Sequence, residues 1–317
     1  MTSFYCARRK SFLSLVVILA GASHCYPDTI TLPPIADTAL FQYQPNNNLG
    51  GELTIPVGGN SATDGITNVS RGLIKFAIAD SIPSAATITS VKLMVTVVQV
   101  PVKQTPVDSV FELRRMLRDW GEGSKRNVAG RPLEGAPAAT GEATWNARFY
   151  PDVSWSAPGA AAPVDFINTS SATNFIRGTN TYAFDSTSTL IADVQGWLNN
   201  PASNFGWLLR SEMETTPLSN RRFASREDTN NAPRLVIDFS LPTANFKFNK
   251  IERSGGTINL FFAVEASRSY TVESRNELGM GFWQMLTNVV PPVALSNYVV
   301  SDAFSAGTNR FYRLRSP

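Results

Sequence analysis

The sequence predicts an all-β protein: a jelly-roll-like antiparallel β-sandwich with one short helix, followed by a second small β-sandwich. Three observations predict this fold class. Apolar and polar residues alternate with a period of two in several segments, as in half-buried strands. Turn-rich stretches at 45–51, 56–65 and 135–141 lie between these segments. One segment alone has helical spacing, so the pattern favours an antiparallel sandwich over an α/β protein.

The first segment, 1–22, is expected to be a signal peptide. Arg8-Arg9-Lys10 forms a basic group, 11–21 is a short apolar run, and Ala20-Gly21-Ala22 offers a small-x-small cleavage site. The apolar run is shorter than the roughly 20 residues that a membrane-spanning helix needs. We therefore expect a mature protein without a membrane span, either secreted or held at the cell surface.

Removal of this segment changes the charge balance and the cysteine content. The chain has 28 basic and 25 acidic residues, and loss of Arg8, Arg9 and Lys10 leaves 25 of each. A chain without excess positive charge gives no indication of a nucleic-acid partner. Cys6 leaves with the signal peptide, so Cys25 has no partner for an intrachain disulfide.

The sequence offers little for catalysis. The single histidine, His24, lies near the expected mature N-terminus, so Ser-His-Asp and Cys-His mechanisms lack a base. No glycine-rich phosphate loop and no G-x-S-x-G motif is present. Asp119 and Glu122 form a candidate carboxylate pair for glycoside hydrolysis. Gly121 and Gly123 are expected to leave this pair mobile, whereas catalysis needs rigid support, so we expect no enzyme activity.

Strands are predicted wherever the alternation is regular. Between Val91 and Val97, Leu93 and Val95 are apolar while Lys92 and Thr96 interrupt them. The predicted strands include 74–78, 91–97, 111–117, 235–239 and 258–264.

A helix is predicted where apolar residues follow helical spacing. Ser186 or Ser188 is expected to cap its N-terminus, and Pro201 ends it. We expect the helix to close one end of the sandwich, with Trp197 in the core rather than in a ligand site. The apolar stripe consists of Leu190, Ile191, Val194, Trp197 and Leu198.

A domain boundary is expected near residue 241. Ser240-Leu241-Pro242-Thr243 follows the 235–239 strand and precedes a new series of strands that runs to Leu314. We therefore predict a first domain at 33–240 and a second at 243–317. The second has enough apolar residues for a small sandwich, and its expected role is packing or spacing.

The long segment 118–159 is rich in Gly, Ala and Pro and carries Trp120, Trp145 and Trp155. A loop of this length in a compact domain is usually functional or disordered. Two interpretations of the rings remain open. They can stack on a sugar ring while neighbouring polar groups bind its hydroxyls, or they can pin the segment to the core while each indole N–H finds a backbone partner.

Asp37 and Arg226-Glu227 are further polar candidates, because they lie close to predicted strands. A buried ion pair that ties terminal strands together is one interpretation. Structural calcium is the other, although no calcium-loop spacing appears and the metal remains unknown. No other cofactor is expected. The oxygen-bearing residues that folding would have to gather are Asp37, Asn46, Asn47, Asn48, Glu227 and Asp228.

Several short motifs follow one another in the first domain. They are Ala36-Asp37-Thr38, Pro45-Asn46-Asn47-Asn48-Leu49-Gly50, Val57-Gly58, Arg71-Gly72-Leu73-Ile74-Lys75-Phe76, and Phe223-Ala224-Ser225-Arg226-Glu227 before Pro233-Arg234-Leu235. Together with 119–123, 143–145 and 193–208, they resemble the DNRLRE-domain proteins. That family consists of exported β-sandwich domains related to carbohydrate-binding modules. Tyr270-Thr271-Val272-Glu273 and Phe311-Tyr312-Arg313-Leu314 resemble the small β-domain that often follows such modules in environmental bacteria.

The resemblance implies carbohydrate binding at a bacterial surface or outside the cell, and it names no sugar. We therefore predict a secreted, noncatalytic protein whose first domain binds a polysaccharide or cell-surface glycan. Its alternative is a structural or adhesive surface module whose aromatic rings are all buried, and a glycan-cleaving enzyme is the third hypothesis. The predicted ligand-binding residues are Trp120, Trp145, Trp155, Asp119 and Glu122.

Overall fold

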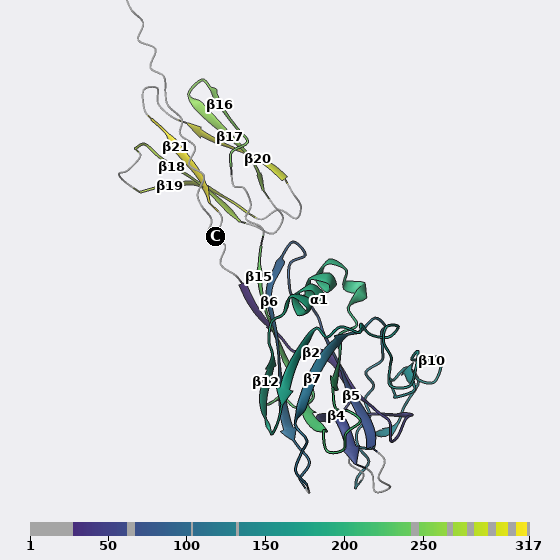
Figure 1. The fold of residues 1–317 in the computed structure, drawn as a ribbon. Coiled ribbons are helices and arrows are strands. Elements are labelled where there is room, and N and C mark those ends of the chain that lie inside the picture. The colour runs from purple at the N-terminus through teal and green to yellow at the C-terminus, as the bar shows by residue number, and fades with distance from the viewer. Residues whose placement is uncertain are drawn as a thin grey trace, which may run out of the picture. The chain divides into compact units, whose positions relative to one another are not determined.

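A computed structural model describes residues 28–61, 67–102, 104–130, 133–241, 247–264, 269–277, 282–290, 296–303 and 309–315. The predicted signal peptide, His24 and Cys25 lie outside the described residues. The chain divides into compact units at residue 242: a first unit, Tyr26–Pro242, and a second unit, which contains Thr243–Pro317. Both units are all-β, which confirms the predicted fold class (Figure 1).

The first unit is a sandwich of two antiparallel layers. The first layer contains β1 (Asp28–Leu32), β15 (Arg234–Ser240), β6 (Thr87–Gln99), β12 (Asn180–Phe184) and β14 (Arg221–Ala224). The second layer contains β2 (Pro34–Phe41), β5 (Thr67–Phe76), β13 (Trp207–Ser211), β7 (Ser109–Arg115) and β11 (Ala172–Ile176). Short strands lie outside these layers: β3 (Asn47–Asn48) pairs with β8 (Ala136–Pro137), and β9 (Ala147–Phe149) pairs with β10 (Val153–Ser154).

The core between the layers follows from the alternation seen in the sequence. On β6, Val91, Leu93 and Val95 are buried, and Leu93 lies opposite Leu235 of β15 and Phe184 of β12. The second layer contributes Ile74, Phe111, Leu113, Trp207 and Leu209 to the same core. Because side chains alternate across a strand, the remaining residues of these strands face outward.

The two layers are joined by β4 (Thr54–Ser61), which belongs to both. Residues 54–57 pair with β14 of the first layer, and residues 58–61 pair with β5 of the second. The chain turns between the layers at Gly58, whose φ is 113°. The prediction that 56–65 is a turn-rich connection was therefore wrong for residues 56–61, because a strand with two glycines at its corner has the composition of a turn.

One helix, α1 (Ser188–Asn199), lies at one end of the first unit's sandwich, and a 3₁₀ turn (Pro201–Ser203) follows it (Figure 1). Its N-cap is Thr187, whose Oγ1 accepts a hydrogen bond from Leu190 N at 2.9 Å. The predicted caps, Ser186 and Ser188, were each wrong by one residue. Trp197 is buried, as predicted. Within the described residues, no helix is long and apolar enough to cross a membrane.

The second layer also carries apolar residues on part of its outer face. Leu40 of β2, Leu73 of β5 and Leu208 of β13 are all fully buried there, together with Met116. Residues 118–166, here called the covering segment, supply the partners of these side chains. The members of this outer cluster that come from the covering segment are Trp120, Ala143, Trp145, Trp155, Ala160 and Phe166.

The second unit is a small sandwich of two three-stranded antiparallel sheets. One sheet has the order β16 (Lys250–Ser254), β17 (Thr257–Val264), β20 (Ser296–Ala303), and the other has the order β19 (Gln284–Val289), β18 (Tyr270–Arg275), β21 (Phe311–Arg315). Its core consists of Phe248, Ile258, Leu260, Phe262, Val264, Tyr270, Val272, Val289, Tyr312 and Leu314.

We expect Gly58→Ala to destabilise the first unit by about 3 kcal/mol, because a left-handed φ and a steric overlap act together. A Cβ at this position would lie 2.7 Å from Ser219 O and 2.9 Å from Asn220 Cα. Gly178→Ala is the matched control, since nothing lies within 4 Å of the Cβ that this substitution would add. Urea unfolding measures both variants, and equal stabilities would contradict the role assigned to Gly58.

Candidate functional site

The three tryptophans predicted to contact a ligand face the protein interior. Trp120, Trp145 and Trp155 are 5%, 8% and 5% exposed. Trp120 Nε1 donates to Phe205 O and Trp155 Nε1 donates to Thr144 O, both at 2.9 Å. The structure therefore has the arrangement in which the rings pin the covering segment. The expected surface display of these rings is absent because the apolar outer face of the second layer takes them up.

Asp119 and Glu122 bind different cations. Asp119 Oδ1 lies 3.1 Å from Lys75 Nζ on β5, and its side chain is 46% exposed. Glu122 accepts from Arg226 Nε and Nη2 at 2.5 and 3.0 Å, and its Oε1 also accepts from Asp37 N at 2.8 Å. The two carboxylates thus tie the start of the covering segment to the sandwich, Asp119 through β5 and Glu122 through β2 and Arg226.

Gly121 and Gly123 were predicted to make this stretch mobile, and the structure shows both of them closely packed. A Cβ on Gly121 would lie 1.8 Å from Gly141 O. Gly123 has a φ of 82°, and a Cβ there would lie 2.3 Å from Asn48 Oδ1. Gly121 is required by the close approach of the Gly141 backbone, and Gly123 by its left-handed φ and the Asn48 side chain, so both allow tight packing of the segment.

Asp37 is the most deeply buried carboxylate of this region, at 1% exposure. Its Oδ2 accepts a hydrogen bond from Arg226 N at 2.7 Å, while the Arg226 side chain lies between Glu122 and Glu227. Burial raises the pKa of Asp37 well above its usual range, and the Arg226 N–H opposes this shift. The predicted tie between strands is therefore present: Asp37 joins β2 to the turn before β15.

Asn48 organises the neighbouring loops. It is completely buried, and its Nδ2 donates to Glu122 O at 2.8 Å and to Ala143 O at 2.9 Å. Its Oδ1 accepts from Gly50 N at 2.9 Å and from Lys125 N at 3.3 Å. One amide side chain thus satisfies backbone groups from its own loop and from two parts of the covering segment.

The residues considered for calcium have other partners. Asn47 Nδ2 donates to Glu134 O, and Asn46 Oδ1 accepts from Asn146 Nδ2. Asp228 Oδ1 accepts from Asn230 N and Asn231 N within its own turn. In the part of the chain that the structure describes, no group of three or more His, Cys, Asp or Glu residues is placed to hold a metal ion. The positive charge that pairs with Glu122 and Glu227 is the guanidinium of Arg226.

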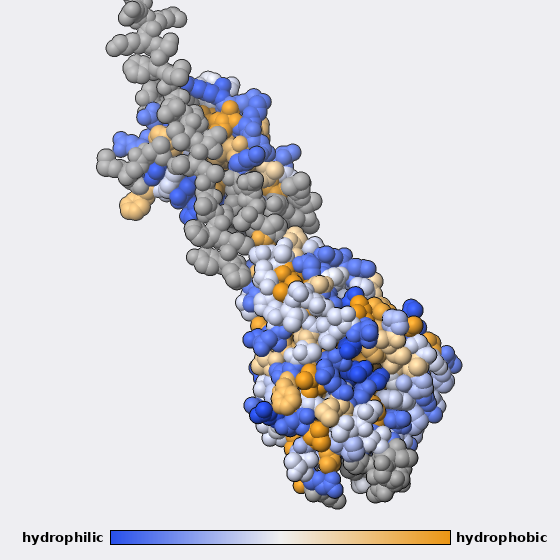
Figure 2. Space-filling model, in the orientation of Figure 1, coloured by the Kyte–Doolittle hydropathy of each residue, from blue (hydrophilic) through white to orange (hydrophobic). Residues whose placement is uncertain are grey.

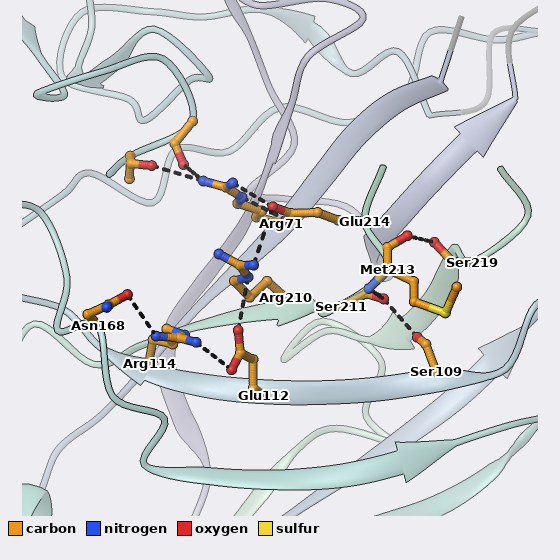
Figure 3. A network of polar contacts seen from close by, with 12 residues as sticks. Arg71, Ser109, Glu112, Arg114, Asn168, Arg210, Ser211, Met213, Glu214 and Ser219 are labelled. Atoms are coloured by element: carbon orange, nitrogen blue, oxygen red, sulfur yellow. Dashed lines mark hydrogen bonds and ion pairs between the residues drawn. The ribbon is translucent and has the colours of Figure 1, made fainter. Parts of the chain in front are cut away.

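A second polar cluster, the charged row, lies on the outer face of the second layer (Figure 3). Arg210 of β13 lies opposite Glu112 of β7 in the ladder, and Arg210 Nε is 3.0 Å from Glu112 Oε1. Arg114 Nη2 donates to Glu112 Oε2 at 2.8 Å. Arg71 of β5 forms a bidentate pair with Glu214 at 2.7 and 2.9 Å.

The charged row continues into the covering segment. Arg71 Nη1 donates to Gly159 O at 2.8 Å and to Ala160 O at 2.9 Å, and its guanidinium lies 5.5 Å from the centre of the Trp145 ring. Glu112 is 2% exposed and Glu214 is 9% exposed at the side chain. With each carboxylate held by arginines, the row joins strands and segment and leaves no unpaired acid for proton transfer.

Sequence reasoning missed the charged row, although a signal was present. Glu112 and Arg114 alternate with Phe111 and Leu113, so they had to share the face opposite the core. Arg210, the partner of Glu112, comes from a strand almost a hundred residues later, and no local pattern indicates that pairing.

The cavity between the layers, around Gly72, is lined by apolar residues such as Ile55, Leu93 and Phe223. On the face drawn in Figure 2, hydrophobic residues of the first unit form small patches among hydrophilic ones. Scattered exposed apolar residues of this kind are normal for a protein surface.

No protein-family model matches the chain, and no curated protein matches it.

We expect Asn48→Ala to destabilise the first unit by about 3 kcal/mol, because it leaves buried N–H and carbonyl groups without partners. Asn46→Ala is the matched control, because the Asn46 side chain bonds to Asn146 at an exposed position. Chemical denaturation measures both variants. A loss for Asn48→Ala no larger than that for the control would refute the organising role of Asn48.

The raised pKa of Asp37 predicts a pH dependence of stability. Between the ordinary value of about 4 and the raised value, the folded state holds a proton that the unfolded state has lost, so stability falls as pH rises. We expect wild type to lose stability relative to Asp37→Asn as pH rises from about 4 to 7. Asp185→Asn, at a side chain that is 75% exposed, should follow wild type. Parallel curves for wild type and Asp37→Asn would contradict this account.

Proposed function

We propose that the first unit is a noncatalytic structural or adhesive module of an exported protein. One observation carries this proposal: four of the five side chains predicted to contact a ligand, the three tryptophans and Glu122, are engaged within the fold. The rings of Trp120, Trp145 and Trp155 cover the second layer, and Glu122 holds Arg226 and the Asp37 backbone. These contacts stabilise the first unit, and a ligand could bind these side chains only by breaking the contacts.

Polysaccharide binding, the function predicted first from the sequence, is our second candidate. The order of motifs between 33 and 240 that resembles DNRLRE-domain proteins supports it, and so does the basic and apolar leader that indicates export. A specific structural observation also favours it, since the second unit exposes an aromatic and cationic face. We therefore place any glycan site on the second unit instead of the covering segment.

We propose no glycan-cleaving activity. Glycoside hydrolysis needs two carboxyl groups that face each other across the scissile bond, about 5 to 10 Å apart. Asp119 binds Lys75, whereas Glu122 binds Arg226 and a backbone N–H of β2. Steady release of reducing ends from xylan or polygalacturonate by the full chain would overturn this part of the proposal.

The structural role predicts that the tryptophans matter for stability and leave glycan retention unchanged. We expect the full chain to migrate without retardation in native gels that contain neutral xylan. Trp155→Phe removes the hydrogen bond to Thr144 O and should lower the Tm by about 2–4 °C. Phe175→Leu, at a side chain that is 47% exposed, is the control and should leave the Tm unchanged.

One result would contradict the structural role of the tryptophans. Retardation by xylan that Trp155→Phe abolishes at an unchanged Tm would assign the ring to a ligand site and would replace the structural role of the first unit by glycan binding.

A further inference from the structure

The outer face of the sheet β19–β18–β21 in the second unit carries a cluster of arginines around one tryptophan. On β18, Tyr270 and Val272 point into the core, so Glu273 and Arg275 point outward. On β21, Tyr312 and Leu314 are buried, so Arg313 and Arg315 share the outer face. Arg313 lies directly opposite Glu273 in the ladder.

Trp283 lies between two of these cations. Its ring centre is 4.5 Å from the Arg275 guanidinium carbon and 4.4 Å from that of Arg313. A guanidinium stacked on an aromatic ring keeps its N–H groups available at its edge, and those donors match a planar anion in a bidentate manner. The stack therefore holds the two cations in place. Arg313 Nε pairs with Glu273 and Arg275 Nε is buried, so an anion would have to bind the terminal N–H groups.

The positive charge of this face exceeds the negative charge. Glu273 pairs with Arg313 and lies 3.6 Å from Arg315, whose side chain is 60% exposed. Arg275 Nε is buried and has no hydrogen-bond partner among the described residues. Within that part of the chain, one glutamate pairs with two arginines, and no carboxylate pairs with Arg275.

Apolar side chains border the same cluster. Phe282, next to Trp283, is 94% exposed, and Met285 of β19 is 62% exposed. Met285 lies opposite Glu273 in the ladder, so it belongs to the arginine-bearing face. An exposed aromatic ring beside fixed cations suits a ligand that offers both an apolar ring face and a negative charge.

We propose that this face, defined by Arg275, Phe282, Trp283, Arg313 and Arg315, binds an acidic polysaccharide. Carboxylate groups of the sugar would accept from Arg275 and Arg315, and a pyranose ring would stack on Phe282. The proposal deepens the second candidate function and does not depend on the structural role of the first unit.

The number of cations favours a polysaccharide over other polyanions. Membrane surfaces are bound by clusters of about 4–8 Lys and Arg residues. A protein that makes about 6–10 phosphate contacts to nucleic acid draws a large part of its affinity from them. This face offers three arginines, two of which share Glu273, which is sufficient for a polymer with one carboxylate per sugar ring and an apolar ring face.

The test is affinity electrophoresis of the full chain in gels that contain polygalacturonate or neutral xylan, at low and constant salt. We expect retardation by polygalacturonate alone. The double variant Arg275→Gln/Arg315→Gln should weaken that binding about tenfold or more. Phe282→Ala should weaken it as well, and its fold should be unaffected because the ring is 94% exposed.

The matched control is Lys247→Gln/Lys250→Gln, which removes the same charge from exposed positions outside the sheet β19–β18–β21. We expect its binding to stay within about twofold of wild type. Circular dichroism and Tm verify that each variant folds. No retardation of wild type, an equal loss in both double variants, or tighter binding to single-stranded DNA or phosphatidylserine vesicles would overturn the proposal. None of these outcomes would test the structural role of the first unit, which the Trp155→Phe measurement tests separately.

Discussion

The organisation of the first unit depends on one constraint: its second layer carries apolar residues on both faces. The inner face packs against the first layer, and the outer face exposes Leu40, Leu73 and Leu208 unless something covers them. Removal of apolar surface from water stabilises the fold by about 25 cal/mol per Å². The covering segment meets this requirement with its tryptophans. A long segment that has only short strands thereby becomes part of the hydrophobic interior, and its tryptophan rings face inward.

Polar contacts then determine the position of the covering segment on the second layer. Asn48 and Glu122 fasten its beginning to the loop before β4 and to β2, and Arg71 fastens its end at Gly159 and Ala160. Each of these side chains bonds to backbone groups, which need partners once they are buried. The hydrophobic rings supply the driving force, and the buried polar groups make the arrangement specific.

Much of the fold could be predicted from the sequence because period-two alternation and helical spacing are local patterns. The strand around Leu93 and the helix with Trp197 follow directly from them. The fate of the covering segment could not be predicted in this way, because a loop tryptophan has the same sequence signature whether it lies on the surface or under it. Consecutive apolar residues at Trp207 and Leu208 did carry a signal, since a strand buried on both faces loses its alternation. Pairings such as Arg210 with Glu112 depend on strand order, which no local pattern reports.

The strand β4 contributes ladder bonds to both layers, with Gly58 at the corner. A break in the pairing of one layer therefore removes the end of a strand on which the other layer depends. The two layers should therefore open together and not one at a time. In hydrogen exchange, the amides of β4 on both sides of Gly58 should become exposed in the same opening event.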